Sequence, residues 1–277
     1  MNYKIINNEA VLDKFIDWLP ELGEDEVYYL QLFGRKKYLE AGTIQNGHNS
    51  LHRFVCKKHN IKNRIQRLET AVGTYLNRDV PLPQECLALY IIPNPRSQEK
   101  AAKNLLKKLA DVVTKPYEKY NVHQLSLTEL HKACSRKVFV DFDYDDKDLG
   151  ETLKKAGEFI NPDALSYLRT RGGFHLLVEV SKVQEEFRHK WHRGLCSLGA
   201  DVKGDDLIPI PGCLQGGYEV PMLEPLIGLN VTYLGGTPQE FELKIEGPGP
   251  ETGCRVFNFP PIPVIPETEF EINNDKS

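Results

Sequence analysis

The chain has 277 residues, 40% of them hydrophobic and 27% charged, and its formal net charge is −4 at pH 7. This composition is typical of a globular protein with a core of its own, and the net charge argues against a uniformly basic surface. The longest apolar run, Cys86 to Ile92, has seven residues, whereas a membrane helix needs about 18. The N-terminus lacks a signal peptide's apolar stretch. None of the six cysteines stands at CxxC spacing, so we expect a reduced, cytoplasmic protein with no membrane partner.

Charge is distributed unevenly along the chain. From Arg35 to Leu68 there are nine basic residues and one acid, Glu40, which gives this stretch a charge of +8 (nine minus one). Like charges at this density repel one another unless a polyanion is nearby. We therefore expect the stretch to bind the phosphate backbone of a nucleic acid; the alternative is a surface for an acidic partner protein. The nine residues are Arg35, Lys36, Lys37, Arg53, Lys57, Lys58, Lys62, Arg64 and Arg67.

The C-terminal end has the opposite composition. Pro238–Ser277 contains eight acids, three bases and seven prolines. Such segments cannot bury enough apolar surface to fold alone. The sequence predicts an acidic, proline-rich tail over residues 241–277, extended or partly disordered.

Residues 1–120 are predicted to form an N-terminal α/β unit. Aromatic and β-branched residues indicate strands, apolar residues at a spacing of three to four indicate helices, and a following proline ends a helix. The expected helices are Asn8–Trp18, Leu51–Tyr75 and Gln98–Val113, and the expected strands are Val27–Phe33 and Cys86–Ile92, the second of them ended by Pro93–Ser97.

Histidine and cysteine recur at and just before the expected helix that begins at Leu51. On one helix, His48, His52, Cys56 and His59 would form a ridge about 16 Å long at 1.5 Å per residue. A ridge of that length cannot surround a single ion. We expect ordinary helix surface with phosphate contacts there, not a zinc site.

Residues 121–240 are predicted to form a second unit with the order β-α-β-β-α-β. This split βαβ order is that of ferredoxin-like and RNA-recognition-motif (RRM) sheets. The fold class expected is therefore α+β: the N-terminal α/β unit followed by an RRM-like antiparallel sheet unit, with the active site on the open face between them. The expected elements are the strand Lys137–Asp143, helix Leu149–Phe159, strands Ala164–Thr170 and Phe174–Val180, helix Val183–Leu195 and a short final strand, Asp206–Ile210.

Side-chain alternation brings three polar residues of this unit to one sheet face. Successive strand residues point to opposite faces, so Asp141 and Asp143 share a face and the apolar residues between them face the helices. In a split βαβ sheet the first and third strands are neighbours, which places His175 beside the two carboxylates. Two carboxylates two residues apart repel each other unless a cation is present, and Mg²⁺ or Mn²⁺ prefers such oxygen ligands. The alternative is a strand that ends in a solvated acidic loop.

Two further motifs accompany the carboxylates. Arg171-Gly172-Gly173 precedes His175, and paired glycines allow backbone amides to approach an anion that Arg171 and His175 can hold. Asp205 and Asp206 precede a Pro211-Gly212 turn. An aspartate that caps a loop would explain the second motif equally well.

Taken together, the motifs VFVDFD (138–143), RGGFHLLV (171–178) and DDLIPIPGCLQ (205–215) resemble the archaeo-eukaryotic primase superfamily, the primase–polymerases. That signature is an hhhDhD strand, a strand that begins with an sxH-type motif, and a later acid ahead of a Pro-Gly turn. The third motif departs from it, because Ile210 stands where the family has a basic residue and Cys213 replaces threonine.

The resemblance implies a role for each matched residue. Asp141, Asp143 and either Asp205 or Asp206 would hold Mg²⁺ or Mn²⁺, and His175, helped by Arg171, would contact the phosphates of an NTP or dNTP. The implied reaction is template-directed nucleotidyl transfer on single-stranded DNA, making or extending primers. Implied partners are template and primer, with a separate helicase or a replication- or CRISPR-associated protein as a candidate, since the chain has no P-loop.

Two other function classes fit the same motifs. A DxD strand also permits a Mg²⁺-dependent nuclease or phosphoesterase. The departure at the third motif favours a catalytically inactive, primase-like module that only binds nucleic acid.

Overall fold

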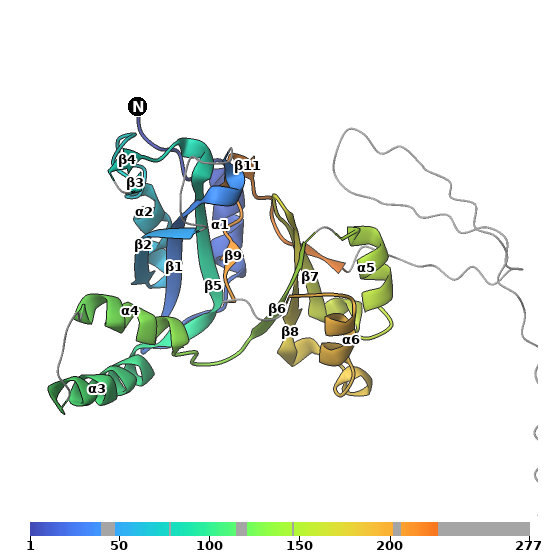
Figure 1. Ribbon diagram of the computed structural model, residues 1–277. Coiled ribbons are helices and arrows are strands. Elements are labelled where there is room, and N and C mark those ends of the chain that lie inside the picture. The colour runs from blue at the N-terminus through green and yellow to red at the C-terminus, as the bar shows by residue number, and fades with distance from the viewer. Residues whose placement is uncertain (40–47, 78, 115–120, 146, 202–205, 227–277) are drawn as a thin grey trace, which may run out of the picture. The chain divides into compact units, whose positions relative to one another are not determined.

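The computed structural model describes residues 1–39, 48–77, 79–114, 121–145, 147–201 and 206–226 (Figure 1). Residues Met1–Leu226 form one compact unit. The predicted acidic tail lies outside the described residues, and the domain boundary expected near residue 120 stays a prediction. The described part is an α+β fold with six α-helices and antiparallel sheets, and none of its helices is long and apolar enough to cross a membrane.

The first sheet has six strands in the order β11-β10-β5-β1-β2, with β9 also paired to β5. The predicted strands at Val27–Phe33 and Cys86–Ile92 are confirmed as β1 and β5. The sheet consists of β1 (Glu26–Arg35), β2 (His48–Cys56), β5 (Leu87–Ser97), β9 (Ile208–Pro209), β10 (Leu214–Gln215) and β11 (Tyr218–Glu219).

Strand β5 does not end at Pro93 as predicted but continues to Ser97. Its register with β1 shifts between the pairs Tyr29–Ile92 and Val27–Arg96, so that one residue of β1 faces three of β5 there. This irregularity leaves Pro93 and Pro95 outside the paired positions, where a missing N–H costs no ladder bond.

The predicted helix Leu51–Tyr75 is wrong over most of its length. Residues 48–56 form β2, which pairs with β1 from Tyr28–Cys56 to Arg35–His48. Within the described part of the predicted span, the helical residues are the 3₁₀ turn Lys58–Asn60 and α2 (Ile61–Gln66). An aromatic and β-branched run reads as either element from periodicity alone, and pairing with β1 decides in favour of the strand. The expected helical ridge of histidines and cysteine therefore does not exist.

Helices cover both faces of the first sheet. On one face α1 and α2 pack against Tyr28, Leu30 and Leu32 of β1 in the main core. On the other, the ring of His131 in α4 meets Tyr29 edge-on at 5.0 Å. The helices are α1 (Glu9–Trp18), which is capped by Asn8 and whose predicted position is confirmed, α3 (Gln98–Thr114), also predicted, and α4 (Val122–Lys132), which was not; β3 (Leu76–Asn77) and β4 (Val80–Pro81) form a separate hairpin.

The second sheet has four strands in the order β12-β7-β8-β6. Its helices pack on one face, against Phe142, Tyr144 and Leu176 among others, as the alternation predicts. The elements are β6 (Phe139–Asp145), α5 (Leu149–Ala156), β7 (Leu165–Arg169), β8 (Gly173–Glu179), α6 (Trp191–Ser197) and β12 (Glu224–Pro225).

Two expected elements of this half differ in the structure. The helix predicted from Val183 starts only at Trp191. The backbone N–H of Gln184 donates to the Asn161 side chain at 3.0 Å and keeps Gln184 extended, and only a 3₁₀ turn, Glu185–Phe187, follows it. The predicted final strand at Asp206–Ile210 is also wrong for this sheet. Its core, β9, pairs with β5 of the first sheet, where Ile208 and Ile210 are fully buried.

The opposite face of the second sheet is only partly open. Phe139, Leu168 and Leu177 belong to the main core, and the ring of Trp18 stacks on Phe139 at 4.6 Å. Apolar residues of this face thus close against the first half of the chain, and the polar residues between them are enclosed. The active-site face expected to be open is therefore half-buried.

Candidate active site

Asp141, Asp143 and His175 lie together, as the strand pattern predicts. Asp143 is the direct partner of His175 in the β6–β8 ladder, and Asp141 is opposite Leu177. His175 Nδ1 lies 2.9 Å from Asp141 Oδ1, and His175 Nε2 lies 3.7 Å from Asp143 Oδ1. One imidazole therefore lies between two carboxylates.

Burial makes the protonation of this group interdependent. The exposed fractions of the side chains are 8% for His175, 11% for Asp141 and 40% for Asp143. Burial alone would lower the pKa of His175, but the charges of Asp141 and Asp143 outweigh it and raise that pKa above its usual 6.5. Burial, reinforced by Asp141, raises the pKa of Asp143 against the opposing effects of His175 and Lys37. The imidazolium is thus the counter-charge that a metal ion could otherwise supply.

The glycine turn between β7 and β8 has two different roles. A Cβ on Gly173 would lie 2.0 Å from the carbonyl oxygen of Tyr144, so only glycine permits this strand pairing. A Cβ on Gly172 would meet Asp145 Oδ1 at 3.6 Å and Lys37 Nζ at 3.8 Å. Strand packing therefore explains why residue 173 is glycine, whereas Gly172 borders the polar side chains of Asp145 and Lys37.

Arg171 is held at this turn by Tyr38 and by residues at β10 of the first sheet. Its guanidinium stacks 4.7 Å from the ring centre of Tyr38 and donates to the carbonyl of Gly216. Its backbone N–H donates to Gln215 Oε1 at 2.9 Å. Among the described residues, no carboxylate lies within 4.0 Å of Arg171, so its charge is available to an anion.

Sequence reasoning missed the aromatic support beneath these cations. The hydroxyls of Tyr38 and Tyr90 lie 3.2 Å apart, and Gln215 Nε2 donates to Tyr90 at 3.0 Å. The guanidinium of Arg35 stacks 4.5 Å above Tyr90, and its buried Nε has no hydrogen-bond partner among the described residues. Gln215 ends the third quoted motif, so its polar side chain in an apolar segment was the one available signal.

The structure places Asp206 in another ion-pair group. Its carboxylate lies 4.0 Å from both Arg96 and Lys137, and its backbone has a φ of +55°. Asp205 lies outside the described residues. Within the part of the chain that is described, no three His, Cys, Asp or Glu side chains are grouped as a complete metal site. The available oxygen donors are therefore those of Asp141 and Asp143.

A hard divalent cation fits these two carboxylates. Mg²⁺ is commonly held by one or two protein carboxylates, with water and substrate phosphates as the remaining ligands. Burial, with a smaller contribution from the charge of Asp141, raises the pKa of Asp143, and a bound cation would favour the ionised form of that carboxyl. Asp141 and Asp143 thus satisfy the minimum donor set, whereas Asp206 is already engaged.

The nine predicted nucleic-acid-binding cations do not form one surface. Three of them satisfy internal partners: Lys57 donates to the carbonyls of Gly23, Glu24 and Glu26. Lys58 bonds Leu19 at the end of α1 and pairs with Glu21. Lys62 pairs with Glu9 and Asp13.

The remaining six fall into two groups. Lys37 borders the carboxylates, and Arg35 and Lys36 adjoin it in sequence at the end of β1 and in the 3₁₀ turn Lys36–Tyr38. Arg53 lies on β2, and Arg64 and Arg67 lie exposed at α2. The first group adjoins the candidate active site. The second group lies on β2 and at α2, apart from the side chains of that site.

Comparisons with protein-family models, curated proteins and solved structures find no match to this chain.

Proposed function

We propose that the chain is the catalytic core of a primase–polymerase, which transfers nucleotides to a primer on a single-stranded DNA template. The observation that carries the proposal is the His175–Asp141 contact of 2.9 Å beside Asp143. It joins the two short motifs of the resemblance into one constellation. The order β6-β8-β7, with two helices on one face, supports an RRM-like core, although its fourth strand pairs differently.

Each residue has a role that follows from its chemistry. Asp141 and Asp143 would hold Mg²⁺ or Mn²⁺, which lowers the pKa of the attacking hydroxyl and neutralises charge at the phosphates. Lys37, which lies beside Gly172, and Arg171, which precedes Gly172 in sequence, would bind the triphosphate. His175, 2.9 Å from Asp141, would donate a hydrogen bond to a phosphate oxygen.

Primer extension tests the proposal directly. The protein is incubated with primed and unprimed single-stranded DNA, NTPs or dNTPs, and Mn²⁺ or Mg²⁺. We expect metal-dependent product that Asp141→Asn abolishes and that the exposed surface variant Asp163→Asn retains. Nucleotides released from DNA without extension would assign the site to a nuclease instead.

One observation favours a non-catalytic module as the second candidate. His175 neutralises Asp141 without a metal, and Asp206 already has two cationic partners. Such a site is charge-balanced on its own. A thermal-shift titration with Mn²⁺ separates the two candidates, because binding to the folded state alone raises the melting temperature. Stabilisation that Asp143→Asn removes supports the enzyme, and no stabilisation supports the module.

A further inference from the structure

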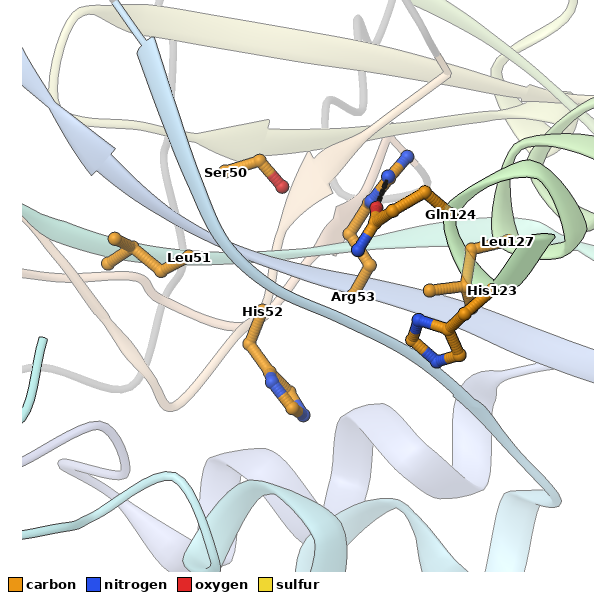
Figure 2. Close-up of a pocket in the computed structure, with 7 residues that line it drawn as sticks. All are labelled: Ser50, Leu51, His52, Arg53, His123, Gln124 and Leu127. Carbon is orange, nitrogen blue, oxygen red and sulfur yellow. Dashed lines mark hydrogen bonds between the residues drawn. The ribbon is translucent and has the colours of Figure 1, made fainter. Parts of the chain in front are cut away.

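Strand β2 is the free edge of the first sheet and lies between helices that cover opposite faces. It pairs with β1 on one side, and no described strand pairs with its other side. Arg53 points toward α4, where it donates to Gln124 and to Thr128, whereas His52 points away from it (Figure 2). The edge therefore presents side chains to α4 and, on its other side, to α2.

Two adjoining depressions follow this edge. One is lined wholly by polar side chains of and next to α2: Asn60, Asn63, Arg64 and Arg67. The other lies between β2 and α4 and is lined by Ser50, Leu51, His52, Arg53, His123, Gln124 and Leu127. Helix α2, which carries the first depression, follows β2 along the chain through the 3₁₀ turn Lys58–Asn60, so the two depressions lie at consecutive elements. We call the combined feature the β2 groove.

The cations of the β2 groove lack acidic partners. Among the described residues, no carboxylate lies within 4.0 Å of Arg53, Arg64 or Arg67, although neighbouring Lys58 and Lys62 are both paired. Arg53 is oriented by amide and hydroxyl acceptors, which leave its positive charge uncompensated. Three guanidiniums and two histidines at one edge favour a polyanionic ligand.

We propose that the β2 groove binds the phosphodiester backbone of single-stranded nucleic acid. This inference rests on the proposed function, in which that strand is the template or primer. The polar lining favours phosphate over a protein partner, because protein interfaces centre on buried aromatic or aliphatic anchors. Arginine forks and the amides of Asn60, Asn63 and Gln124 are donors suited to phosphate oxygens.

The test is binding of a fluorescent oligothymidylate of about 20 nucleotides, followed by anisotropy at several salt concentrations in EDTA. The triple variant Arg53→Gln, Arg64→Gln, Arg67→Gln should bind at least about tenfold more weakly at about 0.1 M salt. The slope of log K against log salt should fall by about 2, since each lost phosphate contact contributes about 0.7. The control Lys103→Gln, Lys155→Gln, Arg188→Gln removes the same charge from exposed positions on other elements and should change affinity less than about twofold.

Three outcomes would overturn the inference. Equal losses in both triple variants would mean that only net charge matters. Unchanged oligonucleotide binding with lost binding of a poly-glutamate peptide would assign the groove to an acidic protein. Retained binding in the double variant Arg64→Gln, Arg67→Gln, which leaves the Arg53 contacts intact, would remove α2 from the groove.

The proposed function and the groove can fail separately. Asp141→Asn should bind the oligonucleotide normally, because no metal is present in the assay. Groove-dependent binding without any nucleotide transfer would refute the proposed function alone. Extension that survives in the triple variant at wild-type DNA affinity would refute the groove alone.

Discussion

At the scale of single residues, the site around His175 compensates its own charge. The imidazole lies between two carboxylates that would otherwise repel each other. Ionised Asp143 lowers the stability of the fold, because burial raises the pKa of that carboxyl. Functional sites commonly carry such a cost.

Replacing Asp143 should therefore stabilise the metal-free protein. Since its folded-state pKa is raised, protonated Asp143 favours the folded state at low pH, and this advantage is lost as pH rises through that pKa. At pH 7 the ionised group is unfavourable, so Asp143→Asn should raise the free energy of unfolding by about 0.5–1 kcal/mol after allowance for solvent screening. Urea denaturation with and without EDTA measures this. Asp163→Asn, at the surface, is the control, and a decrease in stability would contradict the argument.

The pKa of Glu26 is shifted in the opposite direction to that of Asp143. Burial would raise its pKa, but the Arg136 guanidinium at 3.1 Å and the N–H of Gly23 lower it to about 2. The stabilisation is present above the unfolded value of about 4.5 and is lost as pH falls toward 2. The Arg136 side chain is 47% exposed, so screening reduces the contribution to about 1–2 kcal/mol.

Glu26→Gln should consequently lose about 1–2 kcal/mol at pH 7 and lose less on acidification than the wild type. Denaturant unfolding at about pH 7 and about pH 3 provides both numbers. Glu24→Gln changes an exposed neighbouring carboxyl and should match the wild type. An acid-induced loss equal in Glu26→Gln and wild type would show that another group controls acid stability.

At the scale of elements, the sequence predicted those strands and helices whose own pattern is unambiguous. The alternation in 139–145 and 173–179 correctly placed Asp141, Asp143 and His175 on one face, because side-chain direction in a strand is local. Strand β2 was missed because its identity depends on pairing with β1. The partners of Asp206 and the stack of Arg171 on Tyr38 could not be predicted, since they join segments far apart in sequence.

Because β2 is a strand, His52 lies within electrostatic reach of residues from two helices. Burial, Arg64 of α2 and His123 of α4 lower its pKa, and Arg53 adjoins it on the strand. A bound phosphate would add the opposite charge and raise the pKa of His52. At a pH between the pKa of the free protein and that of the complex, binding is therefore accompanied by uptake of a proton. Oligonucleotide affinity should thus increase as pH falls from about 7.5 to about 5.5.

The pH dependence of anisotropy titrations at constant salt checks this. The double variant His52→Gln, His123→Gln should bind with a flatter pH profile, whereas His189→Gln, on another element, should retain the wild-type profile. An unchanged profile in the double variant would exclude both histidines from the phosphate contacts.

At the scale of the whole molecule, the two sheets of Met1–Leu226 share structure that the sequence did not reveal. After α6 the chain returns to the first sheet as β9 and β10, and residues of both sheets join one core. Asn94 of β5 connects them further. Its amide donates to the carbonyl of Phe139 and accepts the N–H groups of Val138 and Phe139, all at 2.8 Å.

These connections predict that the two sheets unfold together. The chain has two tryptophans, and Trp18 packs on the main core whereas Trp191 packs on the core behind β6 and β8. Single-tryptophan variants, Trp18→Phe and Trp191→Phe, therefore report each core separately in denaturant. For each variant, the unfolding curve followed by tryptophan fluorescence is compared with the curve followed by circular dichroism. The two curves should have the same midpoint in denaturant.

Asn94→Ala tests whether that cooperativity passes through the β5–β6 connection. It leaves two backbone N–H groups and one carbonyl without their side-chain partner in a buried position, at a cost of about 2–4 kcal/mol. If Asn94 couples the sheets, the substitution should lower both tryptophan midpoints together, since neither core can unfold while the other remains intact. Asn63→Ala, an exposed position on α2, is the control. It should change the free energy of unfolding seen by either tryptophan by no more than about 0.5 kcal/mol. A lower midpoint for Trp191 alone would show that the second sheet is an independent folding unit, with Asn94 merely stabilising its edge.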